Sequence, residues 1–206
     1  LNSTARTVSE SYGYQEYEAP ILESMALYGA RMGDELVKDQ AYVLQDRGGE
    51  ELALRPELTA SLARMIAQRQ AELAFPVRWW SYGPFWRYER PQRGRSREFF
   101  QWNVDMLGAS SPEADAENVA VLATFLQRVG LTPQQVLVLV NDRRLMDRSF
   151  EKLGIQPSLR PDVSGLLDRR QKLPEEVWRA QASELGLSGA QLSNLDALVR
   201  DPEAWR

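Results

Sequence analysis

The sequence predicts an α+β protein in which a mixed, largely antiparallel sheet is flanked by helices and followed by a small all-helical unit. Two observations support this prediction. Residues 77–107 contain two runs rich in aromatic and β-branched residues around a short polar loop, which is the pattern of two antiparallel strands. Beyond residue 142, apolar residues recur at helical spacing and are interrupted by proline and glycine.

The first 40 residues predict short elements. Residues 3–11 have a helical composition, and Gly13 is a natural stop for a helix. Residues 14–18 alternate as a short strand, and residues 21–28 return to a helical or turn pattern. The polar stretch around Gly33 predicts a mobile loop.

The central part of the chain carries the strongest sheet signals. Residues 41–45 and 51–55 flank a glycine-containing turn, which predicts a hairpin. Residues 58–70 place apolar side chains at helical spacing. Residues 77–88 are the best candidate for a central strand, and residues 99–107 for the strand that returns beside it.

The last part of the chain is predicted to become helical. Residues 114–129 form an amphipathic pattern closed by Gly130, and residues 135–140 read as a buried strand. From about residue 143 to the end, only helical periods are found. We therefore predict two domains, residues 1–142 and residues 143–206.

Composition excludes several kinds of chemistry. The chain of 206 residues has a net charge of −4, so any contact with nucleic acid must be local rather than spread over a basic surface. It contains no cysteine and no histidine, which excludes disulfides, thiolate or histidine metal sites and histidine-based catalysis. No apolar run reaches the roughly 20 residues that span a bilayer, and the first residues do not resemble a signal peptide. We expect a cytoplasmic protein without membrane contact.

An arginine-rich loop is the most informative feature of the sequence. Five arginines crowd the segment between the two predicted central strands: Arg87, Arg90, Arg93, Arg95 and Arg97. Guanidinium groups at fixed positions suit a ligand with several phosphates, because the planar fork binds oxyanions in a bidentate manner. The competing interpretation is a solvated hairpin in which Arg87 pairs with Glu89. Gly94, which permits close backbone approach, and the aromatic pair Phe99 and Phe100 favour a binding role.

Two further groups of polar residues are candidates for a site. Glu57 and Thr59 stand where a predicted strand meets a helix, although an acidic residue and a hydroxyl there also stabilise a helix start. Gln101, Asn103 and Asp105 alternate along one strand and share one face. Three polar residues on an otherwise apolar strand predict a cavity that receives a polar ligand.

Together these segments resemble the class II aminoacyl-tRNA synthetases and, within that class, the histidyl-tRNA synthetase family. Residues 12–23 are similar to motif 1 of the class, whose helix and strand form the dimer interface. Residues 85–105 resemble motif 2 in its histidine-specific form. Residues 54–59, Leu-Arg-Pro-Glu-Leu-Thr, match the amino-acid-binding segment. The resemblance covers about residues 8–142, and the order and spacing of three motifs make it highly specific.

The resemblance implies a site for ATP. Arg87 would hold the α-phosphate of ATP together with the carboxylate of histidine, so that nucleophile and phosphorus stay close. Glu89 would contact the adenine side, Arg95 the terminal phosphates, and Phe99 would stack on the adenine ring. Mg²⁺ would neutralise the phosphates.

The resemblance also implies a histidine site. Glu57, Thr59 and Gln101 would surround the α-amino group, and Asp105 would accept a hydrogen bond from the imidazole. Histidine would then attack the α-phosphorus, release pyrophosphate and be transferred from the adenylate to the 3′ end of the histidine tRNA, without needing a protein histidine. A homodimer is expected if motif 1 acts as it does in the family.

The sequence departs from the family pattern at two positions. Leu58 stands where family members often have glycine, and Asp105 replaces a glutamate found in many members, so its shorter side chain needs a tighter pocket. The chain also lacks a second histidine-binding segment, a glycine-rich motif 3 and an anticodon-binding domain. We expect the N-terminal part of a catalytic domain followed by a helical insertion, inactive as it stands.

Two other functions are compatible with parts of this pattern. The histidine-sensing regulatory subunit of ATP phosphoribosyltransferase shares the fold but does not charge tRNA. It usually keeps the histidine pocket and conserves less of the tRNA- and ATP-binding residues. In this chain the matching motif 2 residues are all present: Arg87, Glu89, Arg95, Phe99 and Gln101. A free-standing RNA-binding module is a weaker match, because the net charge is negative and the basic residues serve a compact site.

Overall fold

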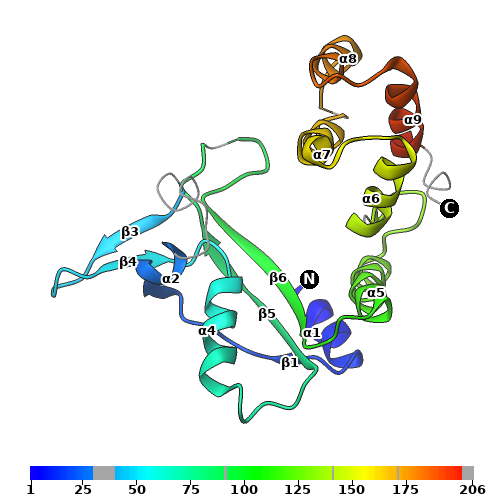
Figure 1. The fold of residues 1–206 in the computed structure, drawn as a ribbon. Helices are drawn as coiled ribbons and strands as arrows, with labels where there is room; N and C mark the ends of the chain where they lie inside the picture. The colour runs from blue at the N-terminus through cyan, green and yellow to red at the C-terminus, as the bar shows by residue number, and fades with distance from the viewer. Residues whose placement is uncertain (30–39, 91, 141, 171, 201–206) are drawn as a thin grey trace. The chain divides into compact units, whose positions relative to one another are not determined.

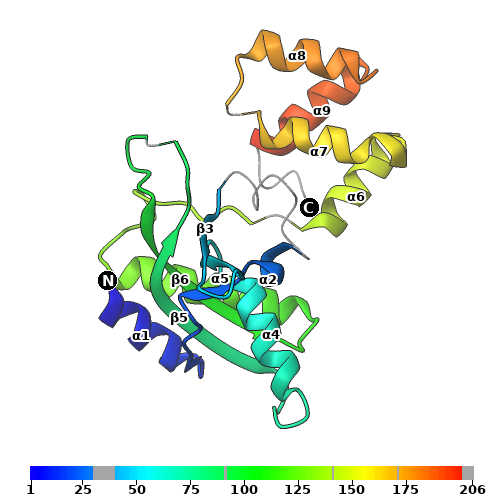
Figure 2. The same ribbon diagram turned by 90° about the vertical axis from the view of Figure 1, so that its left-hand side faces the viewer.

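The computed structural model describes residues 1–29, 40–90, 92–140, 142–170 and 172–200. Contacts within the chain divide it into two compact units, Leu1–Val138 and Leu139–Arg206, which we call the sheet unit and the helical unit. Figures 1 and 2 show the elements of both units. The loop predicted around Gly33 lies outside the described residues.

The sheet unit contains a central sheet with the order β1-β5-β6. β5 (Val77–Trp86) and β6 (Glu98–Leu107) are long antiparallel partners, and β1 (Gln15–Glu16) runs parallel to β5. This confirms the predicted central strand and its return. Aromatic and β-branched residues stabilise such a ribbon because they pack well on a pleated, half-buried surface.

A second, antiparallel sheet has the order β2-β4-β3. β3 (Tyr42–Gln45) and β4 (Glu51–Leu54) form the predicted hairpin, which is therefore confirmed. β2 (Leu22–Ser24) pairs with the other edge of β4 and is followed by the short helix α2 (Met25–Gly29). The predicted helical or turn pattern for residues 21–28 is wrong in its first half. Residues 22–24 form a strand there because they pair with the free edge of β4.

Helices cover both faces of the central sheet (Figures 1 and 2). α4 (Thr59–Arg69) packs on one face, where Leu58 and Leu62 join a core cluster with Phe85. α1 (Asn2–Ser11) and α5 (Pro112–Arg128) lie on the opposite face. The core cluster there comprises Val8, Tyr14, Trp80 and Val121. Alternate residues of β5 thus serve two separate cores.

The strand predicted for residues 135–140 is wrong. Residues 133–135 form a turn and residues 136–140 have no regular secondary structure. Three of their apolar side chains are exposed to solvent: Leu137 by 74%, Leu139 by 69% and Val140 by 67%. A strand needs a partner for its backbone groups, and no described strand pairs with this segment.

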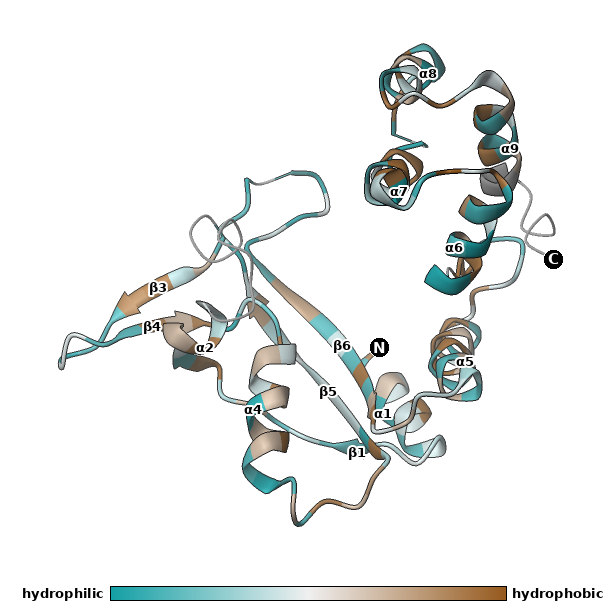
Figure 3. Ribbon diagram, in the orientation of Figure 1, coloured by the Kyte–Doolittle hydropathy of each residue, from teal (hydrophilic) through white to brown (hydrophobic). Residues whose placement is uncertain are grey.

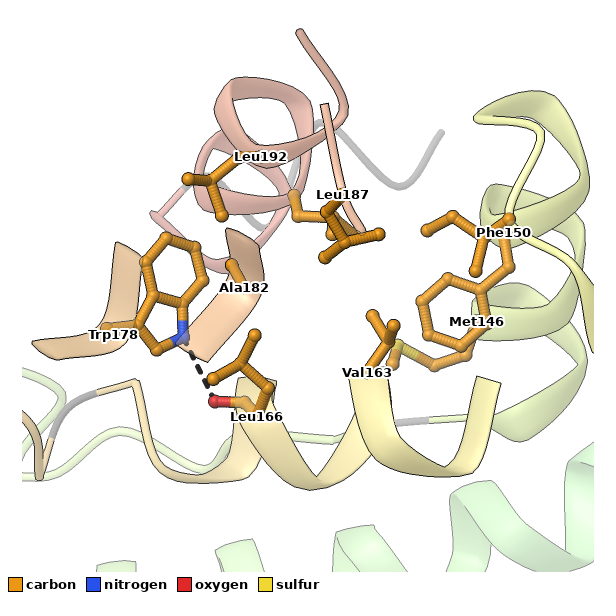
Figure 4. Close-up of a cluster of buried hydrophobic side chains, with 10 residues drawn as sticks. Met146, Phe150, Val163, Leu166, Trp178, Ala182, Leu187 and Leu192 are labelled. Atoms are coloured by element: carbon orange, nitrogen blue, oxygen red, sulfur yellow. Dashed lines mark hydrogen bonds between the residues drawn. The ribbon is translucent and has the colours of Figure 1, made fainter. Parts of the chain in front are cut away.

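The helical unit has the all-helical character that the sequence predicts. Its elements are α6 (Arg143–Lys152), the 3₁₀ helix η1 (Pro157–Leu159), α7 (Arg160–Asp168), α8 (Glu175–Glu184) and α9 (Gly189–Arg200). Hydrophilic and hydrophobic residues alternate along these helices (Figure 3), as expected for amphipathic helices. Their apolar stripes meet in one core around Trp178, whose indole Nε1 donates to the Leu166 carbonyl at 3.0 Å (Figure 4).

No helix in the described part of the chain is both long and apolar enough to span a membrane.

Candidate active site

The candidate site forms where the junction between β4 and α4 meets β5. The backbone N–H of Trp86 donates to the carbonyl of Arg55 at 3.2 Å. One residue further along each segment, Arg87 Nε donates to the carbonyl of Pro56 at 2.9 Å. These two bonds join residues 54–59 to the start of the arginine loop, although 31 residues separate the partners of each bond in sequence.

Arg55 is the buried anchor of this junction. Its side chain donates from Nε to the carbonyl of Pro84 and from Nη1 to that of Ala19, each at 2.9 Å, and its guanidinium lies 4.9 Å from the centre of the Phe85 ring. Burial lowers the pKa of Arg55, and these carbonyl and aromatic partners compensate for its desolvation. The guanidinium lies so close to Gly83 that a side chain there would clash with it. The sequence pattern does not reveal this role of Arg55, because a single buried arginine gives no periodic signal.

Arg87 is held on three sides. Besides the Pro56 carbonyl, its guanidinium lies 5.3 Å from the centre of the Phe99 ring and 3.8 Å from the Glu89 carboxylate. Its side chain is 28% exposed, so the group is oriented by the protein but still open to a ligand. A guanidinium fixed in this way is suited to hold an oxyanion without a large loss of side-chain entropy.

The rest of the arginine loop is exposed and partly paired. A turn follows Gln92, where Gly94 adopts a φ of +81° and the Arg95 N–H donates to the Gln92 carbonyl at 2.9 Å. Glu89 accepts from Arg95 Nη1 at 3.3 Å, so its carboxylate serves both Arg87 and Arg95. Glu89 thus makes the pair with Arg87 that the competing interpretation predicts, with its own side chain 23% exposed. Arg95 is 66% exposed, and such an exposed pair contributes only about 0–1 kcal/mol.

Glu57 closes the start of α4. Its two carboxylate oxygens accept from the backbone N–H groups of Thr59 and Ala60, each at 3.1 Å. This is the helix-initiating role that the sequence already suggested as an alternative. A carboxylate has further lone pairs, however, and these bonds fix its orientation beside the exposed Thr59.

The polar row on β6 lies as predicted. Gln101 is paired with Gly83, Asn103 with Ser81 and Asp105 with Trp79 across the two strands. These residues share the sheet face on which Phe99 and Phe85 stack, with ring centres 6.1 Å apart. The face is therefore the one that α4 covers.

Asp105 lies in an unfavourable environment for a charge. Burial and, to a smaller extent, the negative charge of Glu57 raise the pKa of the Asp105 carboxyl. The side-chain nitrogen of Asn103 is buried and has no hydrogen-bond partner within the described part of the chain. Unsatisfied polar groups of this kind are expected where a ligand supplies the missing partners.

The structure brings most of the predicted residues together. Arg87 is hydrogen-bonded to Pro56, the residue before Glu57. Glu57 and Asp105 are close enough for their charges to interact. Phe100 lies on the opposite face, where its ring stacks on Tyr82 at 5.7 Å, so only Phe99 is placed to face a ligand beside Arg87. The group combines a fixed cation for an oxyanion with carboxylates for a cationic amine.

Comparison with known proteins gives this arrangement a family. The family model described as histidyl-tRNA synthetase matches residues 1–202. The chain is similar to the chloroplastic/mitochondrial histidine–tRNA ligase of Arabidopsis thaliana, with 37% identity over 196 residues that cover 95% of this chain and 39% of that protein. The chain spans less than half the length of the curated relatives it matches.

Solved structures share the fold. Histidyl-tRNA synthetase from Nostoc superposes with a TM-score of 0.78 at 22% identity, over 94% of this chain and 42% of that one. A Bacillus halodurans protein described as an ATP phosphoribosyltransferase regulatory subunit/histidyl-tRNA synthetase superposes with a TM-score of 0.75 at 24% identity, over 96% and 49%. At these identities the likeness concerns the fold alone.

Proposed function

The chain belongs to the histidyl-tRNA synthetase family, and on that premise we propose that it forms part of a ligase that activates histidine with ATP and transfers it to the histidine tRNA. The reaction has two steps. The histidine carboxylate attacks the α-phosphorus of ATP, and pyrophosphate leaves. The 3′-terminal hydroxyl of the tRNA then attacks the adenylate carbonyl, and AMP leaves.

The single observation that carries this proposal is the anchoring of Arg87. Its Nε is held by the Pro56 carbonyl, one residue from Glu57. The remaining guanidinium nitrogens can therefore bridge the α-phosphate and the histidine carboxylate while Glu57 stays beside them. Fixing both reactants in one place accelerates phosphoryl-type transfers, because positioning and charge stabilisation supply most of the catalysis.

The amino-acid end of the site is assigned to the face of β6 and the start of α4. Glu57, Thr59 and Gln101 would receive the α-amino group of histidine, whose positive charge a carboxylate stabilises. Asp105 would accept a hydrogen bond from the imidazole. The raised pKa of Asp105 supports this role, because a buried carboxylate gains from a ligand that donates to it.

The nucleotide end is assigned to the arginine loop. Glu89 would contact the adenine side, Arg95 the terminal phosphates, and Phe99 would stack on the adenine. Mg²⁺ would arrive with the phosphates and neutralise their charge, because Mg²⁺ usually binds through substrate phosphates together with one or two carboxylates.

We also propose the following organisation and location. Residues 1–142 would be part of the catalytic core, and residues 143–206 a helical insertion. The protein would act as a homodimer in the cytoplasm. Exposed apolar side chains within the motif 1 segment support a dimer, since Ile21 is 47% and Leu22 41% exposed.

A histidine-sensing regulatory subunit of ATP phosphoribosyltransferase is the second candidate, supported by the description of the Bacillus halodurans structure. Histidine-dependent exchange of pyrophosphate into ATP separates the two functions. A ligase catalyses exchange, whereas a regulator binds histidine and catalyses none.

We expect Arg87→Ala, in the longest natural form of the protein, to reduce exchange at least about 100-fold, because it removes the main stabilising charge at the reacting phosphate. Circular dichroism should show an unchanged fold. Arg69→Ala, at an exposed position near the end of α4, is the matched control and should keep normal exchange. Near-normal exchange in Arg87→Ala would show that the role assigned to Arg87 is wrong.

A further inference from the structure

Tyr17 is a buried residue that the sequence did not single out. It follows β1 directly, and its backbone N–H continues the pairing by donating to the Trp80 carbonyl at 2.9 Å. The register pairs Gln15 with Trp79, so Tyr17 emerges on the same sheet face as Trp79. Its ring packs against that of Trp79 with the centres 5.3 Å apart. Trp79 is in turn paired with Asp105 on the next strand.

The hydroxyl of Tyr17 has an unusual environment. Tyr17 is only 7% exposed, yet its hydroxyl has no hydrogen-bond partner among the described residues. A buried tyrosine hydroxyl normally finds a partner. On the same face, the side-chain nitrogen of Asn103 is also buried without one. Two unsatisfied donors beside the polar row of β6 indicate a place where a ligand with acceptor atoms completes the structure.

The charges around this hydroxyl are those of the candidate histidine site. Burial raises the pKa of the Tyr17 hydroxyl most. Among the charges, Asp105 raises this pKa most, Arg55 lowers it and Glu57 raises it. Tyr17 therefore lies on the same sheet face as the carboxylate that is proposed to accept from the imidazole, on the other side of β5. A residue that served only to pack on Trp79 would need no hydroxyl at this position.

Resting on the proposed function, we propose that Tyr17 is a specificity-determining residue for the histidine side chain. A neutral imidazole carries one N–H donor and one acceptor nitrogen. Asp105 accepts from the N–H, and the Tyr17 hydroxyl donates to the other ring nitrogen. The pair thereby recognises both nitrogens, and the short Asp105 side chain is supplemented by the long side chain of Tyr17.

Tyr17→Phe tests this inference, because it keeps the ring and removes only the hydroxyl. In the longest natural form of the protein, isothermal titration calorimetry should show histidine binding about tenfold weaker, the usual value of one hydrogen bond to a ligand. A second titration uses pyrrolylalanine, a histidine analogue with a pyrrole ring, in whichever of its two ring isomers the unmodified protein binds more tightly. The pyrrole keeps a ring N–H but lacks the acceptor nitrogen, so Tyr17→Phe and the unmodified protein should bind it with equal affinity.

Tyr14→Phe is the matched control, since it removes a tyrosine hydroxyl from the opposite face of the sheet, where that hydroxyl donates to Asn118 at 2.9 Å. It should leave histidine affinity unchanged. Unchanged histidine affinity in Tyr17→Phe would overturn the inference alone. Equal weakening for histidine and the pyrrole would also overturn it, by showing a packing role. If the unmodified protein binds no histidine, the proposed function fails, and this inference fails with it.

Discussion

The two units of this chain bury different kinds of side chain. The helical unit gathers ten buried apolar residues into one cluster, from Met146 to Leu195. The sheet unit divides its apolar residues among separate clusters on the two faces of the central sheet. It also contains every described residue that is buried and polar or charged: Ser9, Arg55, Ser61 and Ser81.

This difference indicates which unit is built for packing and which for holding polar groups. Burying a polar group is costly unless it is hydrogen-bonded, so a unit that buries several must supply partners for each. Arg55 obtains them from two carbonyls. Tyr17 and Asn103 do not, which places unsatisfied groups beside the candidate site. The sheet unit therefore gives up some stability at its site.

Trp178→Ala has the largest expected effect on stability. Trp178 is fully buried in the single core of the helical unit, and removing a buried tryptophan costs about 3–5 kcal/mol. At about 1.4 kcal/mol per factor of ten, hydrogen exchange in residues 143–200 should accelerate about a thousandfold. Residues 77–107 of the sheet unit should keep their protection.

The neighbouring Val177→Ala is the control for Trp178→Ala. Val177 is 42% exposed on the same helix, so its truncation should change stability by less than about 0.5 kcal/mol. If Trp178→Ala accelerated hydrogen exchange equally in both units, the two units would unfold together. That result would contradict the view that each unit is stabilised by its own core.

Gly83→Ala tests the polar anchor of the sheet unit. The new methyl group would clash with the Arg55 guanidinium, whose two hydrogen bonds and buried position leave it little room to move. Overpacking of this kind should lower the free energy of unfolding by about 2 kcal/mol, measured by urea denaturation.

A glycine-to-alanine substitution in the helical unit should have the opposite effect on the free energy of unfolding. Gly165 lies inside α7 with open space where a side chain would stand, so Gly165→Ala should stabilise the protein by up to about 1 kcal/mol through helix propensity. Equal effects of the two substitutions would contradict the assignment of Arg55 as a tightly held anchor.

Tyr14→Phe should have a small effect on stability at pH 7 and one that depends on pH. Burial, with a smaller contribution from the charge of Glu117, raises the pKa of Tyr14 to about 12. The folded state keeps its proton when the unfolded chain has lost it, so this tyrosine's contribution is complete below pH 10 and is lost as the pH rises toward 12. At pH 7 the substitution should cost about 1 kcal/mol, the value of the hydrogen bond to Asn118.

Above pH 10 the stability advantage of the unmodified protein over Tyr14→Phe should shrink and then reverse, because phenylalanine has no proton to lose. Thermal unfolding at pH 7, 10 and 11.5 measures this. Curves that stay parallel across the range would show that the Tyr14 hydroxyl titrates alike in the folded and unfolded states.

Much of the fold could be predicted from local pattern. The hairpin of β3 and β4, the long pair β5 and β6 and the helices of the second unit follow from periodicity and turn residues, which act over a few positions. The strand predicted at residues 135–140 failed because a nearly continuous apolar run cannot tell whether a partner strand exists. β2 was missed for the converse reason, since an available edge of β4 made a strand of a segment with weak signals.

The sequence by itself determined the kinds of chemistry available here: arginines and carboxylates at motif spacing, in a chain without histidine or cysteine. Only the tertiary structure decided which of these groups meet. In the folded chain Arg87 donates to the Pro56 carbonyl, and the Arg55 guanidinium lies against Gly83. Tyr17 lies on the same sheet face as Asp105. Motifs are local in the chain and can be read from residue types. Contacts across strands depend on register and burial, which only the packed sheet defines.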